Sequence, residues 1–121
     1  MALIFVLDDS AFALKATSII LSGGGYETLL AEDEEDFFKA LKDDSKVPDC
    51  IVLDLLMPGK GGIEILKELK ESGVTIPVVV QTADIQKSVR EKCLEMGAVE
   101  VVNKPPQSKV LLSAIKKAIE G

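Results

Sequence analysis

The stretch LIFVLDD at residues 3–9 decides the fold, because an apolar run gives way within one step to two carboxylates. An uninterrupted apolar run of this kind is typical of a strand that is covered on both faces. Three more runs end in a polar residue: CIVLD at residues 50–54, VVVQT at residues 78–82 and VEVVNK at residues 99–104. The carboxyl ends of the strands in an open parallel sheet border one crevice, so we expect these polar residues to converge.

Segments with helical periodicity separate the predicted strands. In the first of them, residues recur at the i, i+3, i+4, i+7 and i+8 spacing of a buried helix face before glycines 23–25 end the helix. That stripe consists of Ala13, Ala16, Thr17, Ile20 and Leu21. The patterns predict strands over residues 3–7, 28–31, 50–54, 78–81 and 99–102, and further helices starting near Asp33, near Gly62, around Val89 and near Gln107.

Strict alternation of strand and helix predicts βαβ units with parallel pairing and right-handed crossovers. Because the strands are apolar on both sides, the expected fold is an α/β doubly wound sheet of five parallel strands with helices on both faces. A chain of 121 residues is too short for an eight-stranded barrel. We therefore expect one domain over residues 1–121.

Composition excludes several classes of function. The formal charge of −6 gives no electrostatic footprint for nucleic acid, so direct binding of DNA or RNA is not expected. No apolar stretch is long enough for membrane insertion. Cys50 and Cys93 lack the spacing of a disulfide framework or a zinc site, which favours two buried, reduced thiols in a cytoplasmic protein.

The polar motifs together resemble the receiver domain of two-component response regulators. An acidic pair at Asp8 and Asp9, Asp54 within DLLMPGKGG, Thr82 within QTA and Lys104 within KPP follow one another at suitable spacing over the whole chain. The resemblance implies the flavodoxin-like strand order 2-1-3-4-5. It also implies a signalling switch, not an enzyme, that catalyses only its own phosphorylation and dephosphorylation and takes its phosphoryl group from a sensor histidine kinase or a histidine phosphotransfer protein.

The same resemblance assigns a role to each site residue. Asp54 is the expected phosphoacceptor, with a carboxylate that forms an aspartyl phosphate. The expected cofactor is Mg²⁺, held by Asp9, Asp54 and the backbone carbonyl of Leu56, while Asp8 acts through ordered water. This ion also relieves the repulsion among clustered carboxylates. Without Asp54, the Asp8 and Asp9 pair would read equally well as a turn that caps the first helix together with Ser10.

Two further residues complete the predicted site. Lys104 is expected to pair with Asp54 before phosphorylation and with the phosphoryl group afterwards, and the family implies a cis peptide bond between Lys104 and Pro105. Thr82 is expected to donate a hydrogen bond to the phosphoryl oxygens. Taken singly, a surface lysine and a β-branched strand end explain these residues as well.

The chain departs from the family pattern at Val101, where many receivers carry a Tyr or Phe. We therefore expect phosphorylation to persist while the readout is muted or uses another surface. Leu56 and Asp84 flank the site at positions expected to tune the lifetime of the phosphoryl group. Off the predicted stripe of the first helix, Phe12, Leu14 and Ile19 are expected to leave an exposed apolar surface for a partner.

Other interpretations stay open at this point. A phosphatase of the haloacid dehalogenase type needs a second Asp where this chain has Leu56, which makes that class less favourable. A receiver-shaped interaction module with a silent site is another alternative. Within the receiver class, the sequence does not distinguish a phosphorelay intermediate, a phosphate sink, or the receiver fragment of a larger regulator.

Overall fold

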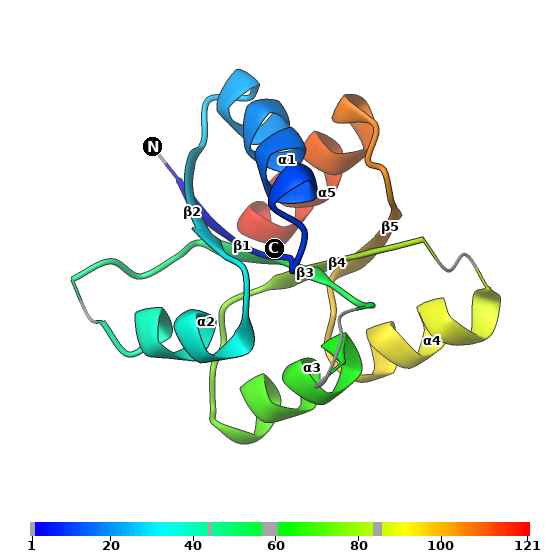
Figure 1. Ribbon diagram of the computed structural model, residues 1–121. Helices are drawn as coiled ribbons and strands as arrows, with labels where there is room; N and C mark the ends of the chain where they lie inside the picture. Colours follow the sequence, from blue (N-terminus) through cyan, green and yellow to red (C-terminus); the bar gives the residue numbers. More distant parts are fainter. Residues whose placement is uncertain (1, 44, 57–60, 84–85) are drawn as a thin grey trace.

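The computed structural model describes residues 2–43, 45–56, 61–83 and 86–121. Strands and helices alternate along them, as Figure 1 shows. The strands are β1 (Leu3–Leu7), β2 (Glu27–Ala31), β3 (Cys50–Asp54), β4 (Val78–Thr82) and β5 (Glu100–Asn103). The helices are α1 (Ala11–Gly23), α2 (Glu34–Leu41), α3 (Gly62–Glu71), α4 (Lys87–Glu95) and α5 (Ser108–Glu120). Each predicted element is present, with its ends displaced by a residue or two.

The five strands form one parallel sheet in the order β2-β1-β3-β4-β5. This order confirms the doubly wound α/β fold. Every residue of β3 and β4 is buried, as their uninterrupted apolar character predicted. The register pairs Leu7 with Leu53 and Asp54 with Gln81, so the carboxyl ends of the strands, which carry the polar residues, lie side by side at one end of the sheet.

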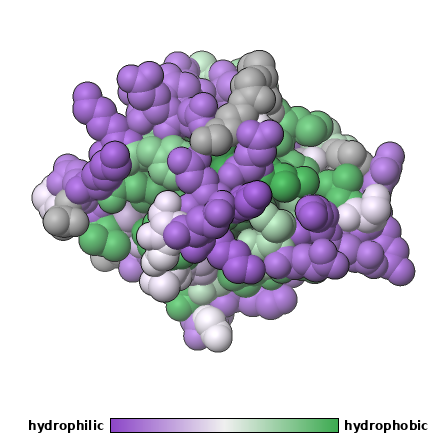
Figure 2. All heavy atoms as spheres, turned by 90° about the horizontal axis from the view of Figure 1, so that it is seen from below, coloured by the Kyte–Doolittle hydropathy of each residue, from purple (hydrophilic) through white to green (hydrophobic). Residues whose placement is uncertain are grey.

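Helices α1 and α5 cover one face of the sheet, and α2, α3 and α4 cover the other (Figure 1). Strand residues alternate between the two apolar layers: Ile4 and Val6 pack with α1 and α5, whereas Phe5 and Leu7 pack on the opposite side. Phe5 contacts Phe37 of α2 with ring centroids 4.8 Å apart. Figure 2 shows the face formed by α2, α3 and α4 from outside, where hydrophilic side chains predominate and apolar ones show between them.

The turn between β1 and α1 is fixed by local hydrogen bonds. Ser10 is the N-cap of α1, and its hydroxyl accepts from the N–H of Ala13 at 3.2 Å. The N–H of Ser10 itself donates to Asp8 Oδ1 at 2.9 Å. The helix-capping interpretation of this acidic segment therefore holds for Asp8 and Ser10, and it orients the Asp8 carboxylate at the same time.

The prediction for the outer face of α1 was right for two residues and wrong for one. Phe12 and Ile19 are 86% and 63% exposed, but Leu14 is only 4% exposed and belongs to the core. The buried residues of α1 are Leu14, Thr17 and Leu21, so the predicted stripe is confirmed at Thr17 and Leu21, while Leu14 is buried in place of Ala13. The sheet buries the long Leu14 side chain in preference to the short Ala13, because burial of more methylene groups is more favourable.

An ion cluster lies on the outer side of β5, and we call Arg90, Glu100 and Lys117 the edge cluster. Arg90 of α4 donates to Glu100 Oε1 at 2.7 Å and to the carbonyl of Val101 at 3.0 Å. Lys117 of α5 donates to Glu100 Oε2 at 3.3 Å. Burial raises the pKa of Glu100, but hydrogen bonds from Val101 N–H, Arg90 and Lys117 outweigh that effect and leave the pKa lowered.

Both cysteines are free thiols in the interior, one in each apolar layer. Burial raises the pKa of Cys50 to about 12, and burial also raises the pKa of Cys93. These thiols agree with the sequence-based interpretation. In the part of the chain that the structure describes, none of the helices has the length and apolar character needed to cross a bilayer.

Candidate functional site

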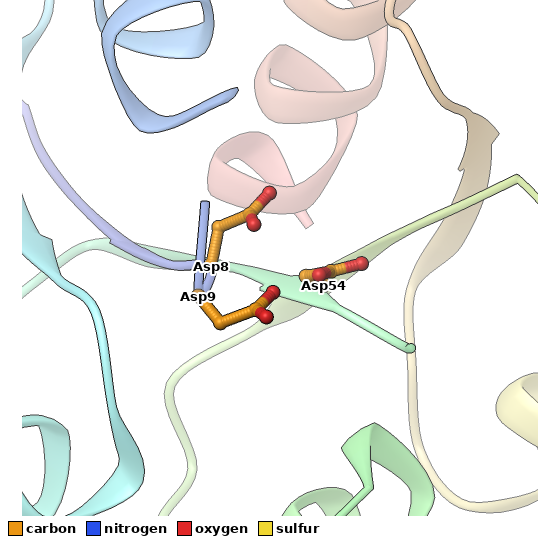
Figure 3. Close-up of side chains that lie close together, drawn as sticks. All are labelled: Asp8, Asp9 and Asp54. Carbon is orange, nitrogen blue, oxygen red and sulfur yellow. The ribbon is translucent and has the colours of Figure 1, made fainter. Parts of the chain in front are cut away.

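Three carboxylates meet where β1 and β3 end. Asp54 is the last residue of β3, and Asp8 and Asp9 follow β1 directly, so the parallel register brings them to the same edge (Figure 3). One carboxylate oxygen from each lies within 4.8 Å of the other two. Asp8 and Asp54 are buried, at 2% and 3% exposed, while Asp9 is exposed. We call Asp8, Asp9, Asp54 and Lys104 together the acidic pocket.

Lys104 supplies the positive charge of this pocket. It follows β5, and its ammonium lies 2.7 Å from Asp8 Oδ2 and 3.3 Å from Asp54 Oδ2. Its backbone N–H donates to the carbonyl of Thr82 at 2.9 Å, and the Lys104–Pro105 peptide bond is cis. The closer partner of the ammonium is therefore Asp8, a pairing that the sequence did not predict.

The protonation of these groups reflects burial and crowding. Burial, followed by the charge of Asp8, raises the pKa of Asp54 from 3.8 to about 6, against the opposing effects of Lys104 and the N–H of Leu56. Burial alone would lower the pKa of Lys104, but its hydrogen bond to Asp8 and the charges of Asp54 and Asp8 raise it. The one ammonium thus pairs with two of the three carboxylates, and the pocket has more acidic groups than basic ones.

The donor set fits a divalent cation that prefers oxygen ligands. Asp54 Oδ2 is buried and has no hydrogen-bond partner among the described residues, and its contact with the Lys104 ammonium is an ion pair at 3.3 Å. Buried polar atoms without partners are uncommon in folded proteins, and a bound cation would account for this one. Carboxylates gathered around a small volume are ligands that Mg²⁺ accepts, with water completing its shell.

The other predicted site residues lie around this centre. Leu56 is 59% exposed, and its N–H donates to Asp54 Oδ1 at 3.3 Å. Thr82 is 1% exposed at the end of β4, one residue beyond the position that pairs with Asp54. Pro58 of the DLLMPGKGG motif and Asp84 lie outside the described residues.

Gly62 holds the start of α3 tightly against the pocket. Its N–H donates to the carbonyl of Leu55 at 2.9 Å. A Cβ at this position would lie 2.6 Å from Leu55 Cα and 2.9 Å from the carbonyl oxygen of Asp54. No side chain fits against backbone at such distances, so glycine is required there for close approach and not for an unusual backbone conformation. In the sequence, the pair Gly61 and Gly62 indicates a loop but not this close approach to the backbone of β3.

One polar residue near the site escaped sequence reasoning. Gln81 of β4 is 2% exposed, and its Nε2 donates to Thr17 Oγ1 of α1 at 3.4 Å. The available signal was a single amide in the otherwise apolar run VVVQ. Val101, at the usual aromatic position, is half-buried and packs against the apolar layer under α3 and α4.

Comparison with protein families matches residues 4–116 to the response regulator receiver domain. The chain belongs to this family. This receiver is 35% identical over 115 residues to the phosphate regulon transcriptional regulatory protein PhoB of Escherichia coli, covering 93% of the chain and 49% of that protein. It is 31% identical over 118 residues to PhoB of Pseudomonas aeruginosa, covering 96% of the chain and 51% of that protein. The chain thus spans about half the length of these relatives.

Solved structures agree with the family assignment. A response regulator receiver domain protein from Clostridium thermocellum superposes with a TM-score of 0.90 at 27% identity, covering 99% of this chain and 95% of the other. The BeF3-activated receiver domain of DrrB superposes with a TM-score of 0.84 at 29% identity, covering 100% of this chain and 99% of the other. The resemblance inferred from the motifs is confirmed, and the receiver is a signalling module rather than a conventional enzyme.

Proposed function

We propose that this receiver is a phosphorylation-dependent switch in which Asp54 accepts a phosphoryl group from the phosphohistidine of a sensor histidine kinase or a histidine phosphotransfer protein. The observation that carries the proposal is the state of Asp54 Oδ2: buried, without a hydrogen-bond partner among the described residues, and 3.3 Å from the Lys104 ammonium. An oxygen in this state is available both to a cation and to an electrophile.

The chemistry requires an ionised Asp54. Its carboxylate oxygen attacks the phosphorus atom, and the phosphorus–nitrogen bond to the donor imidazole breaks as the new phosphorus–oxygen bond forms. The residues of the pocket contribute by position and charge, which dominate phosphoryl transfer. Lys104 lies where it can neutralise phosphoryl oxygens without leaving Asp8.

Mg²⁺ is the proposed cofactor, with Asp9, Asp54 and the Leu56 carbonyl as its protein ligands and Asp8 acting through water. When bound, the ion supplies positive charge to the phosphoryl oxygens and offsets the repulsion between Asp8 and Asp54. Asp9 is the most accessible of the three carboxylates, so it is the residue that an incoming hydrated ion meets first.

Thr82 is proposed to donate its hydroxyl to the phosphoryl group after transfer. A phosphoryl group adds roughly two negative charges and three acceptor oxygens, which is enough to bias a local two-state element. Since Lys104 N–H is bonded to the carbonyl of Thr82, movement of β4 at this point is also felt by the residue that carries the ammonium.

The test is phosphorylation by acetyl phosphate with Mg²⁺, followed by measurement of the intact mass. We expect one phosphate adduct per chain, absent from Asp54→Asn and from reactions with EDTA. Asp49→Asn is a matched control, because Asp49 lies just before β3, at the end of the strand opposite to Asp54. There its carboxylate accepts a hydrogen bond from Leu3 N–H at 2.8 Å. An adduct that persists in Asp54→Asn would overturn the assignment, and rapid turnover of small phosphate esters would favour a phosphatase instead.

A further inference from the structure

Gln81 is a polar side chain placed where the fold calls for an apolar one. Along β4, Val79 packs under α1 and α5, and strand alternation sends Gln81 to the same side. There it reaches Thr17, which is also 2% exposed, from a position 64 residues away in sequence. This is a hydrogen bond between two buried side chains on different elements, outside the acidic pocket.

The arrangement satisfies Gln81 only in part. Its Nε2 donates to Thr17 Oγ1, but its Oε1 is buried with no hydrogen-bond partner among the described residues. An unmade hydrogen bond in the interior lowers stability, and an apolar side chain in this layer would avoid that cost. Packing alone therefore does not explain why an amide occupies this position.

The position of Gln81 relative to the acidic pocket offers an explanation. It stands opposite Asp54 in the strand register, and its carbonyl accepts from the N–H of Leu55 at 2.9 Å. The next residue along β4 is Thr82. Gln81 is thus joined to the strand end that bears Asp54 through its backbone and to α1 through its side chain.

Thr17 lies on α1 near Lys104, which belongs to the acidic pocket. Together with Ser10, Ala16, Lys104 and Pro105 it lines a cavity of about 290 Å³ between α1 and the segment that follows β5. The cavity leaves room for α1 to adjust against this segment without a steric clash. Apolar contacts in a filled core would resist such an adjustment more strongly.

We propose that the Gln81–Thr17 hydrogen bond is a buried polar link that couples phosphorylation at Asp54 to α1, with Gln81 as a positioning residue. This inference rests on the proposed function. At 3.4 Å the bond is longer than usual, so a displacement of β4 by a few tenths of an ångström strengthens or breaks it. Reversal of the amide offers a second discrete arrangement, in which the Thr17 hydroxyl donates to Oε1.

The link gives the receiver a path from the phosphoryl site that does not pass through Val101. Thr82 and Gln81 share a peptide unit, so a tilt of that unit that carries the Thr82 hydroxyl toward the phosphoryl group would also turn the Gln81 side chain, which lies on the opposite face of the sheet. A branched aliphatic at residue 101 cannot make the swing of an aromatic ring, whereas this amide can change its hydrogen bond without changing its volume.

The test is ¹H–¹⁵N NMR of the full chain with Mg²⁺, before and after addition of beryllofluoride as a stable phosphoryl mimic. The readouts are the Gln81 side-chain NH₂ resonances and the backbone amides of residues 18–21, which lie in the half of α1 farther from Asp8 and Asp9. In the wild type we expect both sets to shift. In Thr17→Val and Gln81→Leu, the shifts of residues 18–21 should fall to less than half, while Thr17→Ser, which keeps the hydroxyl, should restore them.

Controls separate this inference from the proposed function. Thr28→Val changes a half-buried threonine of β2 and should leave the α1 response intact. All these variants should still form the Asp54 adduct with acetyl phosphate. Unchanged α1 shifts in Thr17→Val and Gln81→Leu, with the adduct present, would overturn the link alone, whereas a wild type that forms no adduct would overturn the proposed function and this inference with it.

Discussion

The acidic pocket and the edge cluster are built from the same kinds of groups in opposite proportions. The pocket sets three carboxylates against one ammonium, with Asp8 and Asp54 buried, whereas the edge cluster sets two cations against Glu100 on the outside of β5. The pKa of Asp54 is raised to about 6, and the pKa of Glu100 is lowered. A carboxylate surrounded by donors has its charge satisfied by the protein, while one that is buried among other carboxylates is held ready for a ligand.

The largest expected effect concerns the two lysines. Lys104→Met removes the cation of the pocket, and we expect the rate of phosphorylation by acetyl phosphate to fall by roughly 100-fold, as for the loss of one preorganised stabilising group. Lys117→Met, the matched change in the edge cluster, should leave the rate unchanged. The measurement is adduct formation over time by intact mass, and equal rates in the two variants would break the distinction between the clusters.

A smaller effect is expected on stability and its dependence on pH. Because the pKa of Asp54 is higher in the folded state than the unfolded value of 3.8, its ionisation destabilises the fold as pH rises through 3.8 to about 6, and the penalty is complete above that range. Without metal, Asp54→Asn should therefore increase the free energy of unfolding at pH 7.5 by about 1–2 kcal/mol, since solvent screening reduces the full effect of the shift.

Urea unfolding of both proteins in EDTA at pH 7.5 and pH 4.5 measures this difference. The gain should shrink markedly at pH 4.5, where the wild-type Asp54 is mostly protonated in the folded state. An equal gain at both values would mean that the substitution acts through packing and not through charge. Asp49→Asn, at the amino end of β3, again serves as the control.

Addition of Mg²⁺ should oppose the same penalty. A ligand at ten times its dissociation constant stabilises the folded state by about 1.4 kcal/mol, which thermal unfolding detects. We expect this increase for the wild type and its loss in Asp9→Asn. Asp9 is a proposed ligand, and its substitution leaves the buried carboxylates of Asp8 and Asp54 in place. An Asp9→Asn protein that responds to Mg²⁺ like the wild type would remove Asp9 from the ligand set.

The smallest effect is expected in the edge cluster itself. Glu100→Gln should lower the free energy of unfolding by about 1 kcal/mol or less at pH 7, as is usual for ion pairs near the surface. Since the pKa of Glu100 is lowered on folding, its contribution is present above the unfolded value of 4.5 and disappears as pH falls through the lower folded value. Thermal unfolding of the wild type and Glu100→Gln at pH 7 and pH 4 measures this difference. A decrease in stability of several kcal/mol, as expected when a buried ion pair is broken, would contradict the prediction.

The sequence predicted the architecture well because the strands are extreme in composition. The apolar runs CIVL of β3 and VVV of β4 admit no solvent-exposed face, and the polar residues that follow them had to meet at the carboxyl end of a parallel sheet. It predicted the buried face of α1 less well, since Ala13 and Leu14 both fit a helical stripe and their sizes decided between them. Asp8 is the nearer partner of Lys104 because its carboxylate lies 2.7 Å from the ammonium against 3.3 Å for Asp54, a difference that no residue pattern encodes.

Gln81 illustrates a different limit of sequence reasoning. The predicted strand 78–81 ends on this amide, and the run VVVQT does not show that Gln81 is as deeply buried as the valines before it. Its partner Thr17 lies in another element, and β-branched residues are ordinary in a helix that packs on a sheet. Only the hydrogen bond between the two side chains reveals that they belong together.

The state of the two cysteines has a practical consequence for the study of this receiver. Cys50 and Cys93 are both fully buried, and their raised pKa values keep them as thiols and not thiolates at neutral pH. Thiol-directed dyes should therefore not react with the two native cysteines of the folded chain. A single cysteine introduced at the exposed Lys15 of α1 would then carry the only label, and its fluorescence would follow α1 in real time without removal of either native sulfur.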